Sequence, residues 1–149
     1  MIKPPTTVAS LLGLRDLGRE QVLTLMRVAP DAVVNDVAYE KVDGVSRVSN
    51  GSVFPGHFFL RGAEVAMVYV GDPGFLASLT PAGIEAELGG KGSTLRSRIG
   101  KTSNQHVYPD RGFAFAETDN VVEMIEVFSP MSIEDYRARI YNDPGPFIR

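Results

Sequence analysis

Two stretches of this sequence decide its fold: VAMVYV at residues 65–70 and VEMIEV at residues 122–127. Both contain many β-branched residues, so both predict β-strands. A strand in a sheet with one solvent-exposed face alternates apolar and polar residues, and neither stretch shows this alternation. Both faces of both strands must therefore be covered, one by helices and the other by the second repeat, a second chain or a ligand. We favour closure of the sheet or a homodimer over a functional cavity.

The two strands are the last of three pairs of matching segments that occur in the same order in both halves of the chain. SRV at residues 46–48 matches SRI at 97–99, and VFP at 53–55 matches VYP at 107–109. The spacing between partners grows from 51 to 54 to 57 residues. Each step falls in an expected turn, where insertions are tolerated. Such a period indicates a supersecondary unit copied in tandem.

Each half also begins with a predicted helix. Val22, Leu25 and Met26 share one face of a helix expected from about residue 19 to 28. A second helix begins at Thr80-Pro81, because the threonine hydroxyl can cap it and proline suits its first position. Extended segments with glycine-containing turns follow each helix. A short helix is expected over residues 8–12 and a last one from Ser132.

These patterns predict an α+β protein with two degenerate helix-plus-antiparallel-meander repeats. The repeats form one curved sheet, with the helices packed on one face. The chain reads as a single domain over residues 1–149, with repeat one at about 18–73 and repeat two at about 80–130. A C-terminal helix and an extended tail occupy residues 131–149, because prolines at 144 and 146 prevent a helix there.

The twice-repeated helix and meander resemble the architecture of a known family, and the second repeat carries the clearest residues. Its helix begins at Thr80-Pro81 and ends at Leu88-Gly89, and an extended segment carrying Gly100-Lys101 follows. This order is similar to the repeats of the β-lactamase-inhibitor-protein family and of the related single-repeat lipoproteins of outer-membrane assembly. The resemblance covers most of the chain and implies a broad curved sheet that grips a partner. The chain lacks the cysteines of those proteins and their secretion signal, so we expect a cytoplasmic protein.

The amino-acid composition excludes several classes of function. The net charge of −3 argues against nucleic-acid binding, which needs a concentrated positive field. Cysteine is absent, which excludes disulfides, a thiol nucleophile and cysteine-ligated metals. No stretch approaches the roughly 20 apolar residues that a membrane span requires. We expect no cofactor and no metal.

No catalytic constellation is evident. GKT at residues 100–102 resembles the end of a phosphate-binding loop, but Leu95 stands where the motif needs glycine and no helix follows. His57 and His106 have no metal-ligand spacing, and either could act as a general base. We interpret both histidines as polar residues at strand ends, and Glu117 as a solvated turn residue.

Arg47 and Arg98 occupy matching positions in the two halves. Guanidinium groups suit carboxylate or phosphate recognition, so such a pair would be the first place to look for a bound anion or an acidic partner. Lys101 belongs to the basic segment beside Arg98. The alternative is that these basic residues pair with the acidic residues of neighbouring strands.

The leading hypothesis is a non-enzymatic binding module that uses a sheet face or its rim to hold a protein partner or to homodimerise. The alternative is a small-molecule binding protein, or a cofactor-free isomerase or cyclase, with an apolar pocket between sheet and helices. In that case the proton chemistry would fall to His57, His106, Tyr108 or Tyr69. The pocket would be lined by Phe58, Met67, Phe115 and Met124. A structural subunit of a larger assembly is a third possibility.

Overall fold

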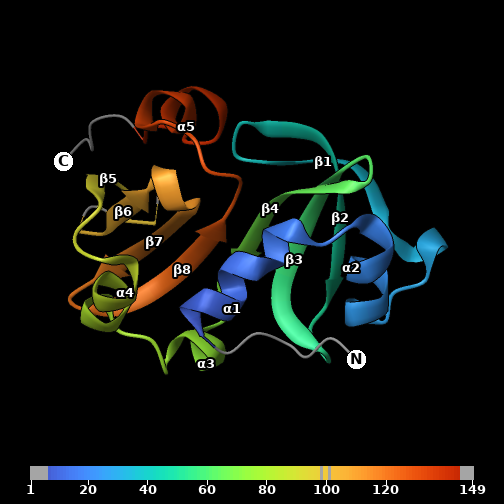
Figure 1. Cartoon of the computed structure of the whole chain (residues 1–149), viewed down its shortest axis with the longest axis horizontal. Helices are drawn as coiled ribbons and strands as arrows, with labels where there is room; N and C mark the ends of the chain where they lie inside the picture. Colours follow the sequence, from blue (N-terminus) through green and yellow to red (C-terminus); the bar gives the residue numbers. More distant parts are fainter. Residues whose placement is uncertain (1–6, 98, 101, 145–149) are drawn as a thin grey trace.

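The computed structural model describes residues 7–97, 99–100 and 102–144, and within them eight strands form one antiparallel sheet (Figure 1). The strand order is β1-β2-β3-β4-β8-β7-β6-β5, so each half of the chain is a meander. The first meander comprises β1 (Val34–Tyr39), β2 (Val42–Asn50), β3 (Phe54–Arg61) and β4 (Glu64–Val70). The second comprises β5 (Ser93–Arg96), β6 (Asn104–Tyr108), β7 (Phe113–Thr118) and β8 (Val121–Val127).

The α-helices are short, and their ends follow from local sequence. They are α1 (Val8–Leu12), α2 (Arg19–Met26), α3 (Pro73–Leu76), α4 (Pro81–Leu88) and α5 (Ile133–Arg139). Thr80 caps α4 through its hydroxyl, which accepts the Gly83 N–H, and Gly89 ends the helix in the left-handed conformation. Ser132 caps α5 in the same way. None of the helices in the described ranges is long and apolar enough to cross a membrane.

One face of the sheet, called the first face, carries four of the helices. Apolar side chains of α1, α2, α3 and α4 form one core cluster with strand residues such as Phe58, Val68, Phe115 and Ile125. The helices lie on this face because each presents its buried residues to it, as Val22, Leu25 and Met26 of α2 do. The apolar stripe expected on this helix is therefore confirmed.

The other face of the sheet, called the second face, carries α5. Tyr136 of α5 and Ile140 after it form a second core cluster with Tyr39, Met67, Ala114 and Phe128. The alternation of Phe113-Ala114-Phe115 explains this contact, because the small Ala114 faces α5 while both phenylalanines face the first cluster. We predicted from the sequence that all helices pack on one face of the sheet, and for α5 this prediction is wrong.

The two-sided apolar strands are covered by the chain itself. Val68, Val70, Ile125 and Val127 lie in the first core cluster, and Met67 lies in the second. The turn between β1 and β2 also reaches α5, where the Lys41 N–H donates to the Ile140 carbonyl at 3.2 Å. No second chain is needed to bury the centre of the sheet.

The two meanders meet along β4 and β8 in a symmetric register. The paired residues are Val68–Val127, Tyr69–Glu126 and Val70–Ile125. An offset of 57 residues relates Val68 to Ile125 and Val70 to Val127, so it exchanges the two outer pairs. The same offset relates the two members of the central pair, Tyr69 and Glu126. This is the offset at which residues 65–70 match 122–127. The register at the centre is therefore what a duplicated meander would produce.

The outer matches are less regular. Ser46 lies within β2, whereas Ser97 follows β5 and bonds through its N–H to the Ser103 carbonyl. These places are not equivalent in the two meanders, and Arg98 beside Ser97 lies outside the described residues. Residues 73–76 after β4 form the helix α3, and the Asp72 carboxylate caps it by accepting the Phe75 N–H.

Candidate functional site

The part of the second face that belongs to the first meander carries a row of polar and aromatic side chains. Ser49 of β2 lies opposite His57 of β3, and His57 lies opposite Tyr69 of β4. Arg47 lies one step along β2 on the same face, because side chains two residues apart on a strand point the same way. Its direct partner is Phe59, so Arg47 and His57 are diagonal neighbours.

A pocket of about 490 Å³ opens at the end of this row. Its walls come from the end of β2, the β2–β3 turn, β3, the end of β4 and the segment that follows β4. They include Ser49, Gly51, His57, Tyr69, Gly71 and Asp72. The volume falls in the range of small-molecule sites. Asp72 is engaged elsewhere, since its carboxylate accepts the Phe75 N–H at 2.9 Å.

Glycine at position 71 makes room for Tyr69. A Cβ atom on Gly71 would lie 2.5 Å from the Tyr69 hydroxyl oxygen and 2.9 Å from the ring carbon that bears it. These distances are far below van der Waals contact, so any side chain at this position would displace the tyrosine ring. The Tyr69 ring therefore lies close to Gly71 at the pocket wall, with its centroid 6.2 Å from that of His57.

Two buried polar atoms in this region have no hydrogen-bond partner among the described residues: Nε of Arg47 and Nδ1 of His57. Buried polar atoms in folded proteins are nearly always paired. A guanidinium Nε can only donate, so the partner that Arg47 lacks is an acceptor. Arg47 does not itself line the pocket, but it is the diagonal neighbour of His57, which does. Its positive charge beside the imidazole favours an anionic group at this end of the pocket.

The electrostatics agree with this geometry. Burial, and then the nearby Arg47 guanidinium, lower the pKa of His57 below its ordinary value. The imidazole is therefore neutral at pH 7 and carries one N–H, which can donate to a ligand or leave the other nitrogen as an acceptor. Arg47 supplies the positive charge in the row, and His57 supplies a neutral hydrogen-bonding group beside it.

A second polar cluster lies at the centre of the sheet, where Glu126 is only 1% exposed. Its carboxylate accepts hydrogen bonds from the hydroxyls of Tyr39 and Tyr136, and the Gln105 amide bonds the Tyr136 hydroxyl. Burial, and then the Glu126 charge, raise the pKa of Tyr136, so this phenol stays protonated and donates. The cluster joins β1, β8, β6 and α5 and has the role of a buried structural link.

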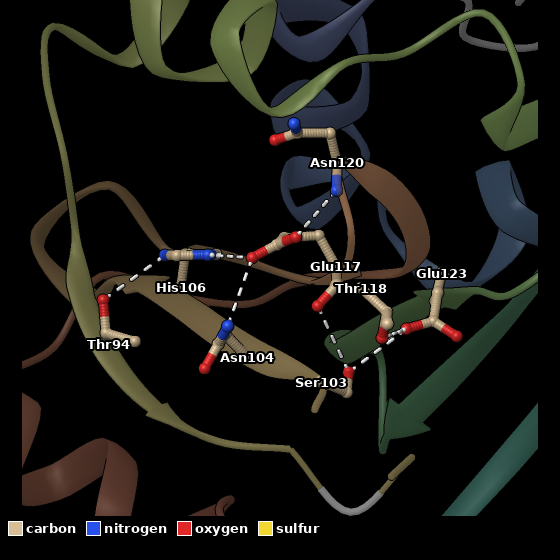
Figure 2. Close-up of polar contacts among 8 residues, drawn as sticks. All are labelled: Thr94, Ser103, Asn104, His106, Glu117, Thr118, Asn120 and Glu123. Atoms are coloured by element: carbon tan, nitrogen blue, oxygen red, sulfur yellow. Dashed lines mark hydrogen bonds and ion pairs between the residues drawn. The ribbon is translucent and has the colours of Figure 1, made fainter. Parts of the chain in front are cut away.

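A third cluster lies on the outer strands of the second meander, on the first face (Figure 2). Nδ1 of His106 lies 3.4 Å from the Thr94 hydroxyl oxygen, and Nε2 lies 3.1 Å from the Glu117 carboxylate. Figure 2 shows the three side chains in one line, with Asn104 and the Asn120 backbone N–H also directed at the carboxylate. Glu117 is half-buried and bonded, so the prediction of a solvated turn residue is wrong.

The structure brings together some of the residues that the sequence singled out and separates others. Arg47, His57 and Tyr69 share one row on the second face. His106 stacks on Phe115 of the first core cluster and thus lies on the opposite face. The Tyr108 hydroxyl is occupied by the Gly90 carbonyl at 2.8 Å. These four candidates for proton chemistry therefore do not form one site.

The expected apolar lining is also divided. Phe58 and Phe115 are fully buried in the first cluster, whereas Met67 is fully buried in the second and Met124 is 1% exposed. All four side chains are buried, and Phe58 and Phe115 lie on the opposite face of the sheet from Met67, so these residues are core rather than site. Arg98 and Lys101, the other predicted binding residues, lie outside the described residues.

Sequence reasoning did not connect Arg47 with His57, or His106 with Glu117. Both contacts depend on which strands pair and in which register. The sequence does show that His57 and Tyr69 each belong to a strand beside a glycine, which is a weak signal of a close backbone approach.

Comparisons of the chain with protein-family models, with curated proteins and with solved structures found no match. The similarity to the β-lactamase-inhibitor-protein repeats therefore stays a prediction from the sequence. Within the described ranges, no group of three or more histidine, aspartate or glutamate side chains could hold a metal ion.

Proposed function

We propose that the protein is a binding module for a small molecule that carries a carboxylate or phosphate group, and that the pocket beside Arg47, His57 and Tyr69 holds this ligand. The observation that carries the proposal is the pair of unpartnered buried atoms, Nε of Arg47 and Nδ1 of His57. An anionic group bound beside them would supply the acceptor that Arg47 lacks, and it would also accept from a His57 tautomer protonated at Nδ1.

The rest of the pocket supports a ligand of modest size. Its volume of about 490 Å³ suits a small molecule. Aromatic rings of His57 and Tyr69 lie next to the polar corner and can pack against an apolar portion of the ligand. Dimerisation through the sheet has less support, because the apolar centre of the second face is covered by α5 and Tyr39.

Benzoate and benzamide are suitable probes, since they share a shape and differ in charge. We expect calorimetric titration to show benzoate binding more tightly than benzamide. The Arg47→Ala variant should lose at least about tenfold in benzoate affinity, because a charged hydrogen bond contributes about 1.5–3 kcal/mol. The Arg47→Lys variant should bind less tightly than wild type, because lysine keeps the charge and loses the planar fork.

Arg61→Ala is the matched control. Arg61 lies on β3, four residues from His57, and its guanidinium donates to the Asp43 carbonyl at 3.0 Å. The control removes the same charge from the same meander and should leave benzoate affinity unchanged. Equal binding of benzoate and benzamide, or equal losses in the Arg47→Ala and Arg61→Ala variants, would refute the proposed site. Absence of binding by benzoate and by inorganic phosphate would refute it as well.

A further inference from the structure

A hydroxyl, an imidazole and a carboxylate lie in a row, because His106 contacts Thr94 on one side and Glu117 on the other (Figure 2). The strand register makes this order possible. Thr94 of β5 lies opposite His106 of β6, and His106 lies opposite Phe115 of β7. Glu117 follows Phe115 by two residues, so it points to the same face and reaches the imidazole diagonally.

The Glu117 carboxylate at the end of this row is held by further hydrogen bonds. Besides the imidazole, the Asn104 amide donates to one Glu117 oxygen at 3.4 Å and the Asn120 N–H donates to the other at 3.1 Å. Burial raises the pKa of Glu117, but the hydrogen bonds from His106, Asn120 and Asn104 outweigh it and lower the pKa below its ordinary value. Glu117 is therefore ionised at neutral pH and can only accept.

An ionised Glu117 determines the tautomer of His106. Nε2 must carry the proton that is donated to the carboxylate, which leaves the Nδ1 lone pair directed at Thr94. The ring is also held in place, since it stacks on Phe115 with a centroid distance of 4.9 Å. A base that is oriented by a third group and lies beside a hydroxyl is the arrangement that activates nucleophiles.

Thr94 is open to reagents. It lies on β5, the strand at the edge of the sheet, and its side chain is exposed. By contrast, the side chains of His106 and Glu117 are 18% and 13% exposed, so the base and its carboxylate are partly shielded behind the hydroxyl. An incoming molecule therefore meets the hydroxyl first.

We propose that Thr94 is a nucleophile that accepts acyl groups from activated esters. Its oxygen attacks the ester carbonyl carbon, and His106 Nδ1 takes the hydroxyl proton. The tetrahedral intermediate collapses with cleavage of the bond to the leaving alcohol, which departs as its anion, and the acyl group remains on Thr94 as an ester. Glu117 is a positioning residue that holds the tautomer and stabilises the imidazolium. This activity is independent of the anion pocket, which lies on the other face.

The test is acetylation of the full chain by p-nitrophenyl acetate, followed by release of p-nitrophenolate and by peptide mass spectrometry. We expect wild type to release p-nitrophenolate at least about tenfold faster than the Thr94→Val variant, because general base catalysis contributes factors of about 10² or more. In wild type the acetyl group should be found on Thr94. Thr94→Ser should retain the reaction, since it keeps the hydroxyl. Thr118→Val is the matched control, because the Thr118 hydroxyl donates to Glu123 and contacts no imidazole in the described structure.

Glu117→Gln tests the positioning role separately from folding. We expect slower acetylation in a variant that still unfolds cooperatively well above the assay temperature, together with a shift of the His106 proton between its two nitrogens in NMR spectra of the imidazole. Acetylation confined to the four lysines and the N-terminus would overturn the proposal. Equal rates in wild type and Thr94→Val, or a Glu117→Gln variant that reacts at the wild-type rate with the wild-type tautomer, would overturn it too.

Discussion

The contact between Gly71 and Tyr69 shows how a single residue shapes the proposed pocket. A methyl group at position 71 would collide with the phenol of Tyr69 and not with backbone, so the ring can swing away. We expect Gly71→Ala to weaken benzoate binding severalfold at a stability cost of about 1 kcal/mol or less. Calorimetric titration and urea unfolding measure the two effects.

Gly51→Ala is the control for this prediction. Gly51 lines the same pocket, and a Cβ atom there would have nothing within 4 Å. It should leave both affinity and stability near the wild-type values. A Gly71→Ala variant that binds benzoate as well as Gly51→Ala does would show that the position of Tyr69 is unimportant for the ligand.

The shifted titration of His57 predicts a pH dependence of stability. Its pKa is lowered in the folded state by burial and by Arg47, whereas the imidazole of the unfolded chain titrates near its ordinary 6.5. Below about pH 6.5 the unfolded state therefore binds more protons, and stability falls as pH falls. His57→Gln removes this titration.

Urea unfolding of wild type and of the His57→Gln variant at a series of pH values checks this prediction. We expect wild type to lose stability relative to the glutamine variant as the pH drops from about 7.5 to about 5.5. His106 is present in both proteins, so its contribution cancels in the comparison. Parallel stability curves over this range would contradict a buried, neutral His57.

At the scale of elements, Glu126 joins strands of both meanders to α5. Its loss would leave the hydroxyls of Tyr39 and Tyr136 without their common acceptor in a buried place. We expect Glu126→Ala to reduce the free energy of unfolding by about 3 kcal/mol or more, as is typical when one partner of a buried polar network is removed.

Glu123→Ala is the matched comparison for this prediction. Glu123 lies on the same strand, is only half-buried, and accepts from the hydroxyls of Thr118 and Ser103. Its removal should cost markedly less. If urea unfolding gives equal losses for the two variants, the buried link between the meanders and α5 contributes no special stability.

The helices and strands also show which structural features can be predicted from the sequence. The helix starts at Thr80 and Ser132 were predictable, because each depends on neighbours within a few residues. The placement of α5 on the second face was not, since Tyr136 reaches it only through partners distant in sequence. The bond between His106 and Glu117 depends on strand register in the same way.

At the scale of the whole molecule, the sequence indicated that both faces of β4 and β8 are covered, and it left open what covers them. The structure supplies the cover from within the chain. In the described ranges the large exposed apolar side chains are Val34, Ile99 and Val121, which lie on separate elements. Scattered apolar residues of this kind do not form an association surface.

We therefore expect a monomer in solution. Sedimentation velocity across a wide concentration range should give a single species near the chain mass of 16.2 kDa. A stable dimer would contradict this expectation and would revive the interface hypothesis. Addition of benzoate should leave the sedimentation of the monomer unchanged, because the pocket lies within one chain.

The proposed anionic ligand binds in the pocket beside Arg47 and His57. An NMR titration of the imidazole nitrogens with benzoate tests this binding most directly, because the chain has two histidines on opposite faces of the sheet. We expect a saturable shift of the His57 nitrogens, no shift at His106, and loss of the effect in Arg47→Ala. Unmoved His57 resonances, or equal shifts at both histidines, would contradict the proposed binding.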